Sequence, residues 1–200
     1  MDDDDGDDNN QNDHEGAQEW IGGDSICVQI GDIFDRGDKE LSCLSLLSRL
    51  SHQAQQDGGV LSVLFGNHEA LNAEGHFDYV TEGGFAEFET KLANAPTSVS
   101  RLVSPLDGDD TDDRKRTARW GALVHPKSPL RKVAFANMKV ALIVGRSVLV
   151  HGGLVPKHLS HYKNENCCDH DDPLGAMNRE AQEWFLKQGA SSNNNTDDEE

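Results

Sequence analysis

Three short apolar runs in this chain each end in side chains that can bind metal ions or transfer protons. The residues that follow the runs 26–30, 60–65 and 147–150 are Asp32, Asp35, Arg36, Asn67, His68 and His151. Because the carboxyl ends of parallel strands present their loops at one edge of a sheet, we expect these side chains to lie together. Such a set of oxygen and nitrogen donors predicts a divalent metal site with acid–base groups beside it.

Three of these residues form a predicted ligand set. Asp32, Asn67 and His151 offer a carboxylate, an amide oxygen and an imidazole, which suit divalent ions. Two such ions about 3.5–4 Å apart can activate a bridging water for in-line attack on phosphorus, and a carboxylate must bridge them. Asp32 is the candidate for that carboxylate because it comes first after its strand. The pattern therefore predicts a metal site of a kind that suits attack on phosphorus.

The other three residues have predicted roles in the transfer itself. Arg36 presents a fixed fork of donors that suits phosphate oxygens. His68 cannot easily reach the same ion as its neighbour Asn67, so it is predicted to protonate the leaving oxygen, with Asp35 holding its tautomer. Taken singly, the same motifs also fit a surface ion pair at Asp35-Arg36, a turn at Asn67-His68 and a flexible strand end at His151.

Hydrophobic periodicity predicts alternating strands and helices around these residues, and therefore an α/β fold. The expected elements are strand 26–30, helix 39–56, strand 60–65, a helical turn at 70–74, helices 84–95 and 112–123, strands 139–144 and 147–150, and helix 173–188. The first strand–helix–strand unit should be parallel and right-handed. Gly145-Arg146 should close a tight hairpin between the last two strands.

Three patterns occur in a fixed order along the chain, namely Gly31-Asp32-x-x-Asp35-Arg36-Gly37, Gly66-Asn67-His68-Glu69 and His151-Gly152-Gly153. Together they resemble the phosphoprotein phosphatases of the calcineurin-like metallophosphoesterase superfamily. Finer features resemble the Shewanella-like protein phosphatase branch, including Gln29-Ile30-Gly31-Asp32, Gly153-Leu154-Val155-Pro156 and Met177-Asn178-Arg179-Glu180. The resemblance extends over residues 20–188 and implies a metallophosphoesterase-like β-sandwich flanked by helices.

The resemblance also implies an activity, a cofactor and a substrate. These are hydrolysis of phosphomonoesters by a metal-activated water, two divalent ions among Mn, Fe, Zn and Mg, and phosphoprotein side chains. By the resemblance, Asp32 bridges the two ions, and Asn67 and His151 are ligands of the second ion. Arg36 then binds the phosphate, and His68 is the general acid, assisted by Asp35.

Two features of that family have no counterpart in this sequence. The family opens with a strand ending in Gly-Asp-x-His-Gly, which binds the first ion, and residues 1–25 hold no match. A further ligand histidine belongs well after His-Gly-Gly, and His158, His161 and His170 lie too close to it. We therefore expect a partial domain without its first strand, with one incomplete metal position, weak metal binding and little hydrolysis. An uncovered sheet edge or apolar groove should accompany the missing strand.

Three functions remain open at this point. The first is a metal-dependent phosphatase, and the second is a pseudophosphatase or fragment that acts as a binding module. The third, a phosphoesterase acting on small metabolites, is disfavoured by Asp35-Arg36-Gly37.

The acidity of the chain is confined to its ends and one loop. The formal net charge is −18, but residues 2–15, 107–113 and 197–200 hold 17 acids and no lysine or arginine. The rest has 19 acids against 18 bases, so it lacks the basic stripe that nucleic-acid binding requires. Segments 1–18 and 190–200 are predicted to be disordered acidic tails around a partial domain at 19–189.

The same composition also bears on the location of the protein and on its binding partners. No apolar run approaches the roughly 20 residues of a membrane span. We expect a soluble, intracellular protein, cytoplasmic or organellar, that binds neither nucleic acid nor membrane. That it binds phosphorylated protein or peptide is what the family resemblance implies. The four cysteines are expected to be free thiols, with Cys27 in a buried strand. The cluster at 167–172 fits a solvated loop better than a zinc site.

Four other residues have two interpretations each. Arg119 and Arg131 could contact phosphate, but surface charges are the simpler expectation for them. His76 and Tyr79 fit either the mouth of the site or local packing.

Overall fold

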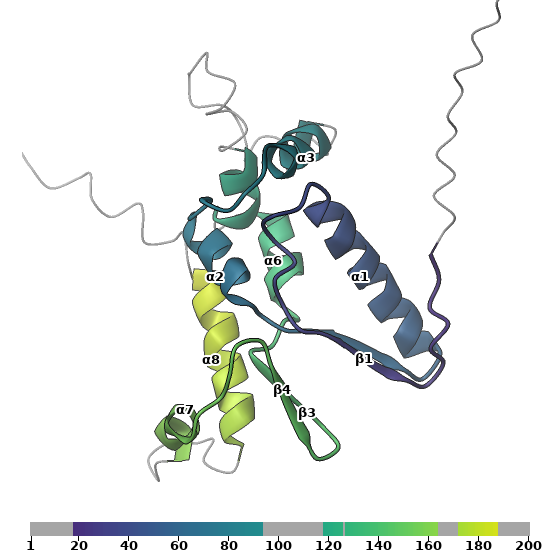
Figure 1. Ribbon diagram of the computed structural model, residues 1–200, viewed down its shortest axis with the longest axis vertical. Helices are drawn as coiled ribbons and strands as arrows, with labels where there is room; N and C mark the ends of the chain where they lie inside the picture. Colours follow the sequence, from purple (N-terminus) through teal and green to yellow (C-terminus); the bar gives the residue numbers. More distant parts are fainter. Residues whose placement is uncertain (1–17, 94–117, 126, 164–171, 188–200) are drawn as a thin grey trace, which may run out of the picture.

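The computed structural model describes residues 18–93, 118–125, 127–163 and 172–187. In chain order its elements are β1 (Ile26–Gln29), α1 (Glu40–Gln56), β2 (Val60–Val63), α2 (Asn67–Glu74), α3 (Glu82–Ala93), a helical segment at 118–123, α6 (Pro129–Phe135), β3 (Ala141–Val144), β4 (Ser147–Val150), α7 (Pro156–Ser160), η2 (His161–Lys163) and α8 (Pro173–Lys187) (Figure 1). The predicted acidic tails lie almost wholly outside the described residues. The acidic loop at 107–113 and most of the cysteine cluster at 167–172 also lie outside the described residues.

A parallel strand pair supports the first two predicted motifs. β1 and β2 pair with Ile26 opposite Val60 and Gln29 opposite Val63, and α1 packs along the pair (Figure 1). Just past β2, the Leu64 N–H donates to Gln29 O, while Phe65 N donates to Lys139 O at 2.8 Å. Because neighbouring backbone groups point to opposite edges, the chain at Lys139 lies on the other side of the β2 end from β1.

A hairpin carries the third motif. β3 and β4 are antiparallel, with Ala141 opposite Val150, and Gly145 enters the turn with φ of 60°. This confirms the predicted hairpin and its Gly145-Arg146 turn. Within the described residues the strands form two sheets of two strands each.

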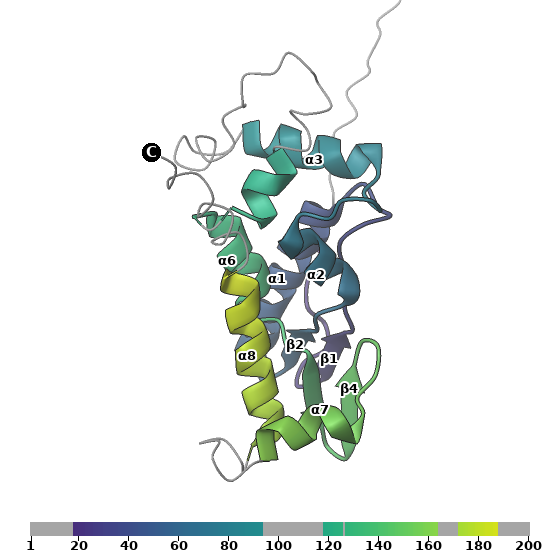
Figure 2. The same cartoon turned by 90° about the vertical axis from the view of Figure 1, so that its left-hand side faces the viewer.

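Aromatic side chains join the end of β2, helix α6 and the C-terminal helix α8 into one core. Phe65 and Phe185 stack with ring centroids 3.7 Å apart, and Phe135 lies 5.2 Å from Phe185. α8 is further fixed to the start of β3, where Asn178 Oδ1 accepts from the N–H groups of Val140 and Ala141. Figure 2 shows α8 running beside the hairpin, with α3 and α7 at opposite ends of the molecule.

Several boundaries differ from the sequence prediction. α2 begins at Asn67, three residues before the expected turn, so the Asn-His motif lies on a helix rather than in a loop. α3 spans residues 82–93 instead of 84–95. The helices α6 and α7 were not predicted because they are too short to show a hydrophobic period.

The outer surface of the parallel pair is more open than the sequence suggested. Cys27 is exposed, so its expected burial is wrong, and Ile26 beside it is also exposed. An open groove runs between α1, β2 and α6, with Val60 and Val133 exposed along it. No helix in the described ranges is long and apolar enough to cross a membrane.

Candidate active site

The loop after β1 has an unusual backbone. Asp32, Asp35 and Arg36 have φ of 58°, 71° and 59°, and Gly31 has φ of 99°. Non-glycine residues rarely adopt this left-handed region, so such a loop needs strong support from its surroundings. The loop begins with a local clasp, in which Gln29 Nε2 donates to Gly31 O and Gly31 N donates to Gln29 Oε1.

Glu69 supplies most of that support from the first turn of α2. Its buried carboxylate accepts from the N–H groups of Asp32 at 2.8 Å, Ile33 at 2.7 Å and Phe34 at 3.4 Å. It also accepts from Gly66 N at 2.7 Å, at the start of its own helix. One carboxylate therefore ties the loop after β1 to the loop after β2.

The next two residues of the loop are held by other acceptors. Asp35 N donates to Glu40 Oε1 at 2.9 Å, and Arg36 N donates to the carbonyl of Tyr79 at 3.1 Å. Five consecutive backbone N–H groups, from residue 32 to residue 36, thus have protein acceptors. This network holds the strained loop in one conformation.

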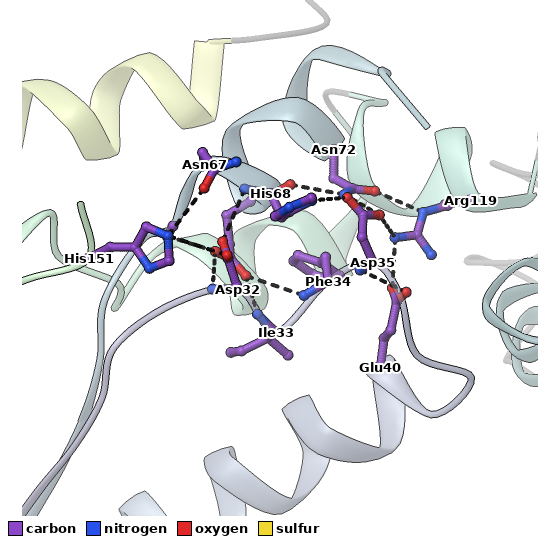
Figure 3. Close-up of polar contacts among 12 residues, drawn as sticks. Asp32, Ile33, Phe34, Asp35, Glu40, Asn67, His68, Asn72, Arg119 and His151 are labelled. Carbon is purple, nitrogen blue, oxygen red and sulfur yellow. Dashed lines mark hydrogen bonds and ion pairs between the residues drawn. The ribbon is translucent and has the colours of Figure 1, made fainter. Parts of the chain in front are cut away.

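The three predicted metal ligands lie together at the ends of β1, β2 and β4. His151 Nε2 is 3.1 Å from Asn67 Oδ1 and 3.3 Å from Asp32 Oδ2 (Figure 3). His151 Nδ1 is 2.8 Å from the carbonyl oxygen of Ile30, so Nδ1 carries the proton and the lone pair of the neutral ring is on Nε2. The Asp32 and His151 side chains are about one third and one quarter exposed, so solvent ions can reach them.

This arrangement fits a cation. A carboxylate oxygen, an amide oxygen and an imidazole lone pair all face one another, and three acceptors can share such a space only with a proton or a metal ion among them. A backbone carbonyl fixing the second ring nitrogen is the usual support of a metal-binding histidine. The described residues contain no group of three or more His, Cys, Asp or Glu side chains placed to hold a metal, because the third member here is an amide.

The predicted acid–base pair lies directly behind these residues. His68 Nδ1 is 2.6 Å from Asp35 Oδ2, and both side chains are buried. Asn72 Nδ2 donates to Asp35 Oδ1 at 2.9 Å and to the His68 carbonyl at 2.9 Å. The His68 N–H donates to Asp32 Oδ1 at 3.3 Å, which connects this pair to the ligand cluster.

A buried arginine lies behind the pair, and this corrects the expectation that Arg119 is a surface charge or a phosphate contact. Arg119 is fully buried, 2.7 Å from Glu40 Oε2 and 3.3 Å from Asp35 Oδ1 through Nη2. Its Nε donates to Asn72 Oδ1 at 2.8 Å. Burial lowers the pKa of Arg119 and raises the pKa of Glu40, while their mutual attraction opposes both shifts.

The Tyr79 ring contacts both Arg36, which is predicted to bind phosphate, and His68, the predicted general acid. Its ring meets His68 edge-on at 5.1 Å, and the Arg36 guanidinium lies 5.2 Å from the ring centroid. Asp35 and Arg36 are therefore not a surface ion pair, since Asp35 is buried against other partners and Arg36 is exposed beside Tyr79. His76, which was expected with Tyr79 either at the mouth of the site or in local packing, has its Nε2 4.0 Å from Glu74 Oε2.

The second arginine with two interpretations, Arg131, also differs from the expected surface charge. It is buried and donates to the carbonyl oxygens of Val124 and Phe185. It therefore connects the segment at 118–125 to α8, away from the ligand cluster.

The sequence prediction missed four supporting residues. It gave no role to Glu69, Glu40 and Asn72, and it gave the wrong role to Arg119. Glu69 belongs to the Gly-Asn-His-Glu pattern, and that position was the only available signal for it. Nothing local distinguishes Glu40 or Asn72 from an ordinary helix residue.

Comparison with known proteins defines the class. The family model of the calcineurin-like phosphoesterases matches residues 13–199, so the chain belongs to that family. This confirms the resemblance read from the three motifs, and with it the α/β metallophosphoesterase fold class.

Individual relatives point to one branch of the family. The chain is 33% identical over 162 residues to Shewanella-like protein phosphatase 2 of Arabidopsis thaliana, covering 72% of this chain and 41% of that protein. A shorter stretch of 61 residues is 39% identical to Shewanella-like protein phosphatase 1 of Plasmodium berghei, covering 30% of this chain and 17% of that one. These matches agree with the branch suggested by the finer sequence features.

Solved structures share the fold. A cold-active protein tyrosine phosphatase matches with a TM-score of 0.57 at 21% identity, covering 84% of this chain and 39% of the other. The enzyme of that description from a psychrophilic Shewanella species matches with a TM-score of 0.52 at 24% identity, covering 84% of this chain and 40% of the other. The chain thus spans about two fifths of the length of these relatives.

Proposed function

We propose that this chain carries the core of a metal-dependent active site that hydrolyses phosphomonoesters on phosphoproteins. The observation that carries the proposal is the convergence of Asp32, Asn67 and His151 directly beside the buried His68–Asp35 pair. The names of its relatives, protein phosphatases and a protein tyrosine phosphatase, favour a phosphorylated protein or peptide as the substrate. The catalytic domain would extend over residues 19–189.

Each side chain has a proposed task. Asp32, Asn67 and His151 would hold a divalent ion, which when bound supplies Lewis-acid activation of a water and of the phosphoryl group. Arg36, exposed beside Tyr79, binds the phosphoryl oxygens through its fork of N–H donors.

The proton movement follows from the geometry of His68. Asp35 occupies Nδ1, so Nε2 is the ring nitrogen that can face the substrate. As the water oxygen bonds to phosphorus and the bond to the leaving oxygen breaks, His68 Nε2 passes its proton to that leaving oxygen.

Two substitutions separate these tasks. His68→Asn should lower kcat by about 10²–10⁴-fold, the range for a lost general acid, with bound metal unchanged. Asp32→Asn should lower both the rate and the metal content, which elemental analysis after gel filtration measures. Exposed counterparts, His52→Asn and Asp57→Asn, serve as controls because both lie at α1 away from the ligand cluster.

The outcomes also distinguish the alternatives. Hydrolysis of a phosphopeptide that a chelator abolishes and Mn²⁺ restores supports the proposal. Metal binding without hydrolysis, together with phosphopeptide binding, would favour the binding-module function instead. Unchanged metal content in Asp32→Asn would reject the ligand assignment.

A further inference from the structure

The two carboxylate oxygens of Asp35 have separate partners. Oδ2 contacts His68 Nδ1 at 2.6 Å, whereas Oδ1 accepts from Asn72 Nδ2 at 2.9 Å and lies 3.3 Å from Arg119 Nη2. The side chain of Asp35 is fully buried. Holding Oδ1 from behind fixes the rotation of the carboxylate, and so fixes where Oδ2 meets the His68 ring (Figure 3).

Arg119 is itself held from several directions. Its Nη2 reaches Glu40 as well as Asp35, and its Nε donates to the side-chain oxygen of Asn72. The rings of Phe88, Phe77, Phe34 and Phe85 surround the guanidinium at 4.6, 5.6, 5.8 and 6.0 Å. A planar fork can satisfy three acceptors at fixed angles at once, which the single ammonium of a lysine cannot.

We propose that Arg119, anchored by Glu40, is a positioning residue for His68 and acts through Asp35 and Asn72. Arg119 touches neither the ligand cluster nor His68 in any described contact, so its effect passes through the Asp35 carboxylate. Glu40 strengthens the link because its other oxygen accepts from Asp35 N, so the same carboxylate fixes both the backbone and the partner of Asp35. The inference rests on the proposed role of His68 as proton donor.

The first test is spectroscopic and needs no activity. A proton on His68 Nδ1, held against a carboxylate over 2.6 Å, should give a resolved far-downfield NMR resonance that disappears in Asp35→Asn. In Arg119→Lys, and more mildly in Glu40→Gln, this resonance should weaken or shift upfield. The matched control is Arg131→Lys, which alters an equally buried arginine outside the network and should leave the resonance in place.

The second test uses substrates that need the acid to different degrees. Aryl phosphates with strongly acidic phenols release their leaving group without a proton, whereas those with weakly acidic phenols require one. Arg119→Lys should lower kcat by about 10²-fold for phenyl phosphate, as a misplacement of about 1 Å can, with KM little changed. The kcat for dinitrophenyl phosphate should fall by a much smaller factor. Arg131→Lys should lower both rates by the same factor, if at all.

Several results would overturn the inference. A downfield resonance that is retained in Arg119→Lys, or that is absent from the wild type, means that Asp35 is not held as proposed. An equal loss of kcat for all leaving groups would make Arg119 purely structural. If Arg119→Lys does not fold, Glu40→Gln and Asn72→Leu carry the same two measurements. Absence of any hydrolysis in the wild type would count against the proposed function alone, since the NMR result still decides the positioning.

Discussion

At Glu40, burial and a neighbouring cation act on one carboxyl group in opposite directions. Burial raises its pKa above the ordinary 4.5, and the charge and hydrogen bond of Arg119 lower it. Asp35 is the other carboxylate within this network, and Glu87 also attracts Arg119. The pKa of Glu40 therefore depends on the Arg119 guanidinium, and a substitution of Arg119 tests this dependence.

Removing Arg119 should extend the pH range over which the stability of the protein falls as pH rises. In Arg119→Met the pKa of Glu40 in the folded state rises further, while the unfolded value stays near 4.5. Between these two values the folded state keeps a proton that the unfolded state has released, so the free energy of unfolding falls as pH rises. The slope should reach at most about 1.4 kcal/mol per pH unit. Urea denaturation at a series of pH values measures it.

The double variant Arg119→Met/Glu40→Gln provides the control for this prediction. An amide does not titrate, so the additional slope should disappear. A slope that persists in the double variant would show that Glu40 is not the group that takes up the proton.

The sequence predicts the candidate metal ligands better than the residues that support them. Asp32, Asn67 and His151 could be expected to converge because each follows a strand, and strand ends share an edge of the fold. Glu69 and Arg119 could not be placed this way. Glu69 bonds to the backbone 37 residues earlier in the chain, and Arg119 lies 84 residues from Asp35. A buried charge is recognised only when its distant partner is known.

At the scale of elements, the site depends on two loops that approach each other very closely. Gly66, at the start of α2, faces the loop after β1. A Cβ built on Gly66 would overlap Asp32 Oδ1 and lie 2.7 Å from Asp32 N and 2.8 Å from Glu69 Oε2. Glycine is therefore needed here because of the contact between backbones, not because of its φ, which is −102°.

Gly66→Ala should separate the two loops and weaken metal binding. The added methyl group has backbone and a fixed carboxylate as neighbours, so the loop itself must move. We expect a loss of about 1–3 kcal/mol in the free energy of unfolding, with lower Mn²⁺ affinity by titration calorimetry. Gly152→Ala is the matched control because a Cβ there meets no atom within 4 Å. Equal Mn²⁺ affinity in both variants would contradict the close-approach argument.

Element types were largely predictable, whereas their ends were not. The strands and the long helices α1 and α8 show their period over enough residues to be read directly. The start of α2 was misplaced because Gly66 and Asn67 resemble a turn in isolation. Glu69 makes the difference, since it accepts from Gly66 N and so begins the helix three residues earlier.

At the scale of the whole molecule, α8 connects the hairpin that carries His151 to the parallel pair that carries Asp32 and Asn67. Its Phe185 stacks on Phe65, and Gln182 Nε2 donates to the carbonyl of Met138 just before β3. The relative position of the two sheets thus depends on a helix that begins about twenty residues after the last site residue. The motifs alone do not indicate this dependence, because no α8 residue belongs to them.

Phe185→Ala should therefore destabilise the fold and disturb the distant site together. Phe185 is 3% exposed and contacts Phe65, Phe135 and Trp184, so its truncation leaves a cavity and should cost about 3–5 kcal/mol in the free energy of unfolding. The neighbouring Leu186 is 41% exposed, and Leu186→Ala should stay within about 0.5 kcal/mol of the wild type. Urea denaturation measures both variants, and Mn²⁺ titration in the absence of denaturant reports on the ligand cluster. If Phe185→Ala unfolds at the same urea concentration as Leu186→Ala, α8 does not connect the two sheets as described. If it is destabilised but binds Mn²⁺ like the wild type, the parallel pair and the hairpin keep their relative position without it.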